Sequence, residues 1–474
     1  MIHLALTDTI VIALYFGVIL YVGFRTGSKR QSSEEDFLLA GRSLTLPIFV
    51  MTLVSTWYGG ILGVGEFSYR YGISNWLVQG VPYYFFAALF AVMLAKKIRA
   101  TNFYTIADKL QQSYDTKTAV LGSVLTFILM TPAPYILMLS VFLQMLFGWS
   151  LLVSLTFTAL VAVSYLYVGG FRSDVETDVV EFVLMFAGFA VIIPYCVSRF
   201  GGFEYLTSHL PPLHLTWHGG NSTGYIVVWF FIALWTLVDP AFHQRCYAAR
   251  DGRVARRGIL ISIFFWFLFD LMTATAGLYA RAAIPDLQQP VMAYPMLAEA
   301  VLPPIAKGLF YVGMLATIMS TLNTLAFVSA QTLGRDIWQR IRSTNSTGMM
   351  NSKLPIQIGL IVSFALSVVL ALCMQSVIEL WYTIGTVVIP GLLVPLIAGY
   401  FDKLKIPPAY AFLSMLFGWL TSVGWMLSRY VILHSDRYPL GIEPMYPGLL
   451  MSIALWGIGR AISVTRVNKN GTTP

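Results

Sequence analysis

The chain has 474 residues, of which 57% are hydrophobic and only 11% are charged. Soluble domains carry roughly 25% charged residues, so this composition excludes an ordinary soluble protein and indicates one large integral membrane domain, residues 1–474. The net charge of +8 does not indicate nucleic acid, because the basic residues gather in loops on one side of the predicted spans.

Hydrophobic runs predict an all-α integral membrane protein with about thirteen transmembrane helices. In chain order the predicted spans cover residues 7–25, 44–67, 76–98, 118–147, 150–169, 175–198, 223–245, 257–282, 305–333, 354–374, 377–401, 408–432 and 441–461. The first run is expected to be a retained helix, because no small-residue cleavage site follows it. The spans at 7–25, 408–432 and 441–461 are expected to be peripheral helices.

The distribution of Lys and Arg predicts the orientation. With the N-terminus placed outside, most of the 30 Lys and Arg residues fall in loops on the inner side, as the positive-inside rule requires. An odd number of spans then places the C-terminus in the cytoplasm. We therefore expect a multi-pass protein of a plasma membrane or bacterial inner membrane, with the lipid bilayer around it.

Two of the predicted spans are interrupted. Four glycines between residues 59 and 65 weaken the helix of the second span, and Pro240 interrupts the seventh. Interrupted spans at matching places in two halves are typical of inverted-repeat transporters, whose binding site lies near the membrane midplane. The order of spans places repeat one at about 44–198 and repeat two at about 223–401.

The ninth span carries a cluster of polar side chains that share a region of one helix face. They are Thr317, Ser320, Thr321, Asn323 and Thr324. Hydroxyls in a membrane helix can bond back to their own helix or pack closely against a neighbour. They can also hold a hard cation such as sodium, together with carbonyls freed at a helix break. The crowding favours a cation site without deciding it.

Five stretches, taken in order, resemble motifs of the sodium:solute symporter family. They are residues 36–44 (DFLLAGRSL), 69–76 (YRYGISNW), 169–180 (GGF, then TDVV), 240–249 (PAFHQRCYAA) and 319–337 (MSTL, then DI). Glu181 departs from the family pattern, which usually has Gln there. The resemblance implies a LeuT-like fold of five plus five helices and sodium-coupled import of a small organic solute by alternating access.

The resemblance also implies two cation sites. In the family, one sodium is held by two hydroxyls of the ninth span and by carbonyls where the second span unwinds. The corresponding residues here are Ser320, Thr321, Met51 and Val54. Some members hold a further sodium, or a cation pathway, at positions that correspond to Asp178, Asn323 and Thr324. The Asn in place of a hydroxyl puts this second site in doubt.

Candidate solute-binding residues lie near the two breaks. They are Ser55, Tyr58, Asn75, Gln79, Trp235, Asp239 and Phe242, with Glu66 expected in the outer vestibule. The family's sugar carriers use Gln and Glu at positions that align with Tyr58 and Asn75, which disfavours a sugar. Ionisable residues at membrane depth are functional by default, and Asp239 and Asp270 qualify. Asp239 would either pair with a cationic group on the solute or cap the amides of the following half-helix.

Other functions compete with sodium-coupled import. Proton coupling through Asp178 or Asp239 would use the same fold, and a non-transporting solute sensor would keep the binding site. An enzyme is not expected, because no HExxH pattern is present and the three cysteines show no metal spacing. The histidines at 209, 214 and 218 share one outer loop, where a solvated loop is favoured over a metal site.

Overall fold

The computed structural model describes residues 2–29, 33–342, 353–374, 377–431 and 438–470. This part of the chain is helical and contains no strand beyond a single bridge between Leu44 and Ala249. Its first half contains α1 (Leu6–Lys29), α2 (Glu34–Leu39), α3 (Leu46–Trp57), α4 (Ile61–Tyr71), η2 (Trp76–Gly80), α5 (Val81–Met93), α6 (Ala95–Ala100), α7 (Ile106–Ser113), α8 (Thr116–Leu129), α9 (Ala133–Phe147) and α10 (Leu151–Phe200).

The second half continues with helices of more varied length. They are α11 (Phe203–His209), η3 (Pro212–Leu215), α12 (Thr223–Ile232), α13 (Trp235–Val238), α14 (Pro240–Ala248), α15 (Gly252–Ala283), α16 (Ala293–Val301), α17 (Ala306–Gln331), η5 (Thr332–Gln339), α18 (Arg340–Arg342), α19 (Lys353–Cys373), α20 (Val377–Gly399), α21 (Pro408–Val431) and α22 (Met445–Asn470). Residue 432, the predicted end of the twelfth span, lies outside the described residues.

The observed helices account for the predicted spans. Among the described residues, eleven helices are long and apolar enough to cross a membrane, and the pair α3–α4, bent by 60°, makes a twelfth span. α10 has 50 residues, and a helix of that length extends about 75 Å, more than twice the thickness of a bilayer core. Gly170, with φ 57° and ψ −145°, breaks it into two segments that correspond to the predicted spans 150–169 and 175–198. The all-α membrane fold is confirmed.

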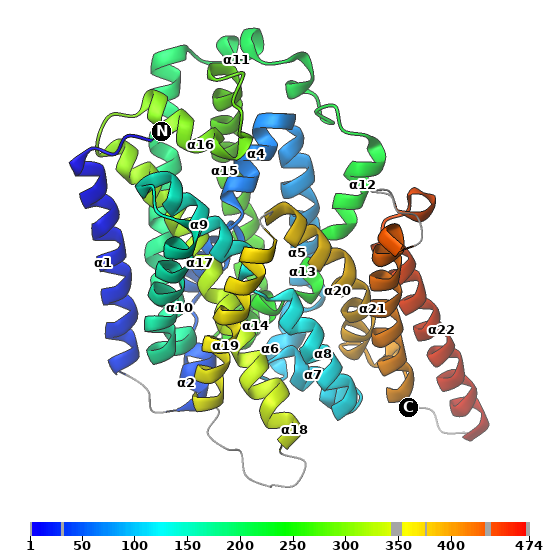
Figure 1. The fold of residues 1–474 in the computed structure, drawn as a ribbon. Helices are drawn as coiled ribbons and strands as arrows, with labels where there is room; N and C mark the ends of the chain where they lie inside the picture. The colour runs from blue at the N-terminus through cyan, green and yellow to red at the C-terminus, as the bar shows by residue number, and fades with distance from the viewer. Residues whose placement is uncertain (1, 30–32, 343–352, 375–376, 432–437, 471–474) are drawn as a thin grey trace.

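The helices form a bundle around α17, whose most apolar stretch is buried throughout (Figure 1). α1 lies at one edge of the bundle, and α21 and α22 lie at the opposite edge. α1 begins at the upper end of the view and α22 ends at the lower end, so the two helices place the described ends of the chain on opposite sides. The division into repeats at about 44–198 and 223–401 stays a prediction.

α10 and α17 meet with no side chain between their backbones. A Cβ atom built on Gly188 would lie 2.8 Å from the Cα atom of Gly313. Small residues allow this kind of close approach between membrane helices, where packing replaces the hydrophobic effect as the source of association. The contact fixes the position of the ninth predicted span, on α17, against the sixth, on α10.

The two interruptions predicted from the sequence are present. Tyr58, Gly59 and Gly60 separate α3 from α4, and a Cβ atom on Gly59 would lie 2.4 Å from the Thr321 side chain. Glycine is therefore required for α17 to approach the break. In the second interrupted span, Asp239 has extended backbone angles between α13 and α14, because a residue before proline avoids the helical region.

Candidate substrate and cation sites

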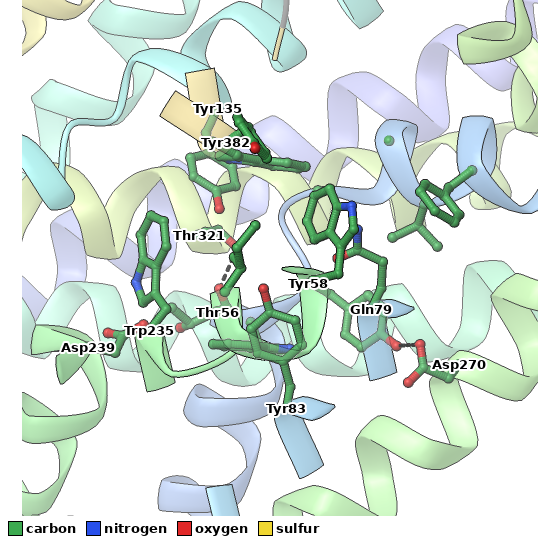
Figure 2. Close-up of a pocket in the computed structure, with 18 of the residues that line it drawn as sticks. Thr56, Tyr58, Gln79, Tyr83, Tyr135, Trp235, Asp239, Asp270, Thr321 and Tyr382 are labelled. Carbon is green, nitrogen blue, oxygen red and sulfur yellow. Dashed lines mark hydrogen bonds between the residues drawn. The ribbon is translucent and has the colours of Figure 1, made fainter. Parts of the chain in front are cut away.

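A cavity of about 450 Å³ lies between the broken helices α3–α4 and α12–α14. Its volume is in the range of small-molecule sites. Figure 2 shows side chains from both breaks pointing into it. The predicted candidates that line it are Tyr58, Gln79, Trp235, Asp239 and Phe242, together with Glu66. Ser55 and Asn75 are buried and do not line it.

Aromatic rings dominate the cavity wall. Trp57 packs against Tyr83 with ring centroids 4.9 Å apart and against Phe242 at 5.6 Å, both edge to face. Tyr135 and Trp381, from α9 and α20, close another side with centroids 5.7 Å apart. The sequence does not predict Tyr83, Tyr135 and Trp381 as wall residues, since nothing in their local pattern distinguishes them from ordinary aromatic residues of membrane helices.

Asp239 caps α14. Its Oδ1 atom accepts hydrogen bonds from the backbone amides of Ala241, at 2.7 Å, and Phe242, at 3.4 Å. An N-terminal carboxylate satisfies amides that lack helical partners and interacts favourably with the helix dipole. Asp239 therefore has the capping role, which is one of the two alternatives that the sequence leaves open. Its side chain also lines the cavity. Pairing with a solute stays a prediction.

Asp270 contributes a second carboxylate to the same cavity from α15. It is only 5% exposed, and it accepts hydrogen bonds from the hydroxyls of Tyr58 and Tyr84. Tyr58 sits in the break between α3 and α4, so the cavity carboxylate is linked directly to that break (Figure 2). The sequence singles out Asp270 only as an ionisable residue at membrane depth, and its tyrosine partners come from other spans.

Oxygen atoms also converge where α17 passes the end of α3. Thr321 donates a hydrogen bond of 2.6 Å to the carbonyl of Thr56, and Ser320 donates one of 2.6 Å to Asp178 Oδ1. The last carbonyls of a helix have no amide partner within it, so those around Val54 are available to other groups. The Met51 carbonyl accepts from the Ser55 hydroxyl at 3.0 Å. Hydroxyls, carbonyls and a carboxylate are the ligands that a hard cation such as sodium takes.

The residues of the second predicted cation site surround a guanidinium group. Arg245 is fully buried, and its Nη2 atom lies 3.1 Å from Asp178 Oδ2 and 2.9 Å from Thr324 Oγ1. Thr324 also donates to Asp174 Oδ2 at 2.7 Å, whereas Asn323 donates to the Tyr165 hydroxyl instead. In the sequence Arg245 stands out only as part of a motif, and the position of its charge inside the bundle is not predicted.

An ion-pair network ties α7 to the segment after α17, at the end of the bundle opposite α4 and α12 (Figure 1). Asp108 Oδ1 lies 3.1 Å from Arg335 Nη1 and 2.6 Å from Arg340 Nη2. Thr105 donates a hydrogen bond of 2.9 Å to Asp336 in the same network. We call Asp108, Arg335, Asp336 and Arg340 the α7 network. It joins α7 to η5 and α18 at this end of the molecule.

A profile of the Sodium:solute symporter family matches residues 37–418. The chain belongs to this family. It is 28% identical over 347 residues to the sodium/pantothenate symporter of Haemophilus influenzae, covering 68% of this chain and 71% of that one. It is 25% identical to the sodium/pantothenate symporter of Escherichia coli, over 95% and 96% of the two chains. It is 23% identical to high-affinity choline transporter 1 of Caenorhabditis elegans, over 80% and 70%.

Two solved structures of other transporters share the fold of this chain. A Na⁺-coupled sialic acid symporter in a substrate-bound outward-open state superposes with a TM-score of 0.77 at 15% identity, over 96% of this chain and 97% of the other. Mhp1, a nucleobase-cation-symport-1 family transporter, superposes with a TM-score of 0.61 at 11% identity, over 91% and 95%. The expected LeuT-like fold is confirmed, and the protein is a sodium-coupled symporter and not an enzyme.

Proposed function

We propose that this symporter imports a small organic solute, and that Ser320, Thr321 and the carbonyls of Met51 and Val54 hold the coupling sodium. The observation that carries the proposal is the hydrogen bond from Thr321 Oγ1 to the Thr56 carbonyl. It brings the hydroxyl face of α17 to the end of α3, where the carbonyls of residues 54–57 lack helical partners and that of Met51 lies one turn earlier. The relatives include symporters of pantothenate and transporters of choline, two compounds that share only the class of small organic solute.

The proposed mechanism is alternating access. The cavity reaches Glu66, Arg70 and Tyr225, at the α4 and α12 end, while the α7 network joins elements at the other end. With the N-terminus outside and the C-terminus in the cytoplasm of a plasma membrane or bacterial inner membrane, this cavity faces outward. Sodium bridges α3 and α17 and stabilises that state, because it binds only when the two helices are close. Solute binding at the breaks then precedes opening of the inner end.

We propose further that one sodium is transported per solute. A sodium ion among Asp178, Thr324 and Asn323 would lie beside the Arg245 guanidinium, and two like charges 4 Å apart repel by about 4 kcal/mol at an effective dielectric constant of about 20. The guanidinium already satisfies Asp178 and Thr324. In this proposal the Arg245 side chain occupies the position at which the family resemblance implies a second sodium ion.

The test is sodium dependence at fixed pH in proteoliposomes. Wild-type uptake of pantothenate or choline should rise hyperbolically with sodium concentration, as expected for one ion. Replacing both Ser320 and Thr321 with Ala should raise the half-saturating sodium concentration at least tenfold. Thr317→Ala is the matched control, because the Thr317 hydroxyl donates to the Gly313 carbonyl of its own helix. Unchanged sodium dependence in the double variant would exclude this ion site, and uptake driven by protons alone would exclude sodium coupling.

A further inference from the structure

The cavity wall carries an excess of negative charge. Four residues with charged side chains line it: Glu66, Arg70, Asp239 and Asp270. Glu66 and Arg70 form an i,i+4 ion pair of 3.0 Å near the α4 end, so their charges offset one another. Two carboxylates remain, each less than 10% exposed. Burying a charge without an opposite charge is costly, so a solute that brings positive charge would stabilise the ionised carboxylates.

The two remaining carboxylates differ in how they are satisfied. Asp239 interacts with the amides at the start of α14, which carry part of a positive charge. Asp270 has only the neutral hydroxyls of Tyr58 and Tyr84 as donors, and no Lys, Arg or His within the described ranges forms an ion pair with it. Asp270 is therefore the carboxylate that most needs a cation.

The surroundings of Asp270 suit an organic cation. Tyr58, which donates to Asp270, packs edge to face on Phe269 with centroids 4.5 Å apart, and the rings of Trp57, Tyr83 and Phe242 line the same cavity. Aromatic faces attract amino and ammonium groups by their quadrupole, most strongly where water is excluded. Hydrophobic walls also favour a cation with carbon attached over a bare hydrated ion.

We infer that the transported solute carries a positively charged amino or ammonium group, which binds against Asp270 among these rings. The inference rests on the proposed function and names the chemical class of its solute. An anionic solute would meet two carboxylates and no free cation in the described wall. A neutral solute would leave Asp270 uncompensated at membrane depth, which makes it the alternative to test.

Binding can be measured on the full-length protein in detergent, with sodium present, by tryptophan fluorescence, because Trp57, Trp229, Trp235 and Trp381 line the cavity. Choline, tetramethylammonium and putrescine serve as cationic probes, with 3,3-dimethylbutan-1-ol as the neutral isostere of choline and pantothenate as an anion. At least one cation should give a saturable change, at least tenfold tighter than the neutral and anionic probes. Equal binding of choline and its isostere, or binding of pantothenate alone, would overturn the inference.

Asp270→Asn should weaken binding of the cation at least tenfold and leave the sodium concentration for half-maximal response unchanged. Asp402→Asn is the control, since that carboxylate is exposed on the surface and pairs only with Lys405. If Asp270→Asn does not fold, the wild-type comparison of choline with its isostere decides alone. Sodium-driven uptake restricted to neutral or anionic solutes would refute this inference and leave the proposed function standing. Cation binding without sodium-stimulated uptake would refute the proposed function instead.

Discussion

Asp239 shows how one residue can serve both the fold and the site. Its Oδ1 atom caps α14 while the side chain lines the cavity. Asn caps a helix almost as well as Asp, and Ala does not. We expect Asp239→Asn to keep the thermal unfolding midpoint of the wild type, and Asp239→Ala to lower the free energy of unfolding by about 1 kcal/mol.

Thermal unfolding of the three proteins in one detergent measures this difference. Equal losses in the Asn and Ala variants would show that the charge, and not the cap, stabilises the break. Cation binding on the same samples should fall less for Asp239→Asn than for Asp270→Asn, because the amides of α14 already offset part of the Asp239 charge.

At the scale of residues, the sequence predicted what local spacing determines. The hydroxyls of Ser320 and Thr321 stand out by their position on one helix, and both are buried at the end of α3 in the structure. The location of Arg245 between α3, α10 and α17 could not be predicted, because it depends on how three distant helices pack. The pairing of Asp270 with Tyr58 and Tyr84 was out of reach for the same reason.

At the scale of elements, glycine and proline marked the breaks correctly. The sequence did not predict the turn at Ala233 and Leu234 that separates α12 from α13. The surrounding run is aromatic and aliphatic and contains no helix-breaking residue, so only tertiary packing can select that turn. The single long α10 was also not predicted as such, although Gly170 divides it where the sequence separates two spans.

The α7 network is the element that we expect to hold the inner end closed. Asp108 pairs with both Arg335 and Arg340, so Asp108→Asn removes the charge that joins them to α7. Breaking a largely buried ion pair on one side is destabilising, and the loss falls on the state in which the network is intact. The population open at this end should therefore rise.

Alkylation of Cys246 reports this opening. Cys246 lies fully buried on α14, and the other two cysteines can be replaced by Ser to isolate it. We expect its reaction with a thiol reagent to be several-fold faster in Asp108→Asn. Asp251→Asn provides the control, because Asp251 is exposed, caps the N-terminus of α15 and lies outside the α7 network. An equal rate in both variants would mean that the network does not gate the inner end.

At the scale of the whole molecule, His214 gives the fold a dependence on pH. Its ring N–H donates to the Tyr69 carbonyl at 2.9 Å, and its own carbonyl accepts from the Ile73 amide at 2.9 Å. Burial lowers the pKa of His214 below its usual value of about 6.5. The unfolded chain therefore binds the proton more readily than the folded one. Its contribution to stability is full above about pH 6.5 and is lost as the pH falls below that value.

The thermal unfolding midpoint should accordingly decrease as the pH is lowered from about 7.5 to about 5.5. His214→Gln keeps a side-chain N–H donor and cannot take up a proton, so this variant should show a shallower fall over the same range. His209→Gln is the matched control, because His209 lies exposed in the same connection and its ring bonds to Ser208 and Tyr205 of α11. Identical pH profiles for the wild type and the Gln variant would remove His214 as the source.

The sequence was most informative about the whole molecule, because composition and span order respond to the bilayer and not to detailed packing. Hydropathy located the spans, and the two described ends of the chain lie on opposite sides, as the predicted odd number of spans requires. Span order alone could not define the cavity, since its wall combines side chains from α3, α4, η2, α5, α9, α12, α13, α14, α15, α17 and α20.

The contact between Gly188 and Gly313 separates two parts of the transporter: the joined helices α10 and α17, and α3, which we expect to move relative to them. Because the two backbones touch there, α10 and α17 cannot come closer at this point without a clash. We expect Asp178 and the Ser320–Thr321 pair to move together, because Ser320 also donates a hydrogen bond to Asp178. In the proposed mechanism the sodium ion leaves when α3 withdraws its carbonyls from these residues. Sodium release would then report the displacement of α3 alone, relative to the α10–α17 pair that the glycine contact joins.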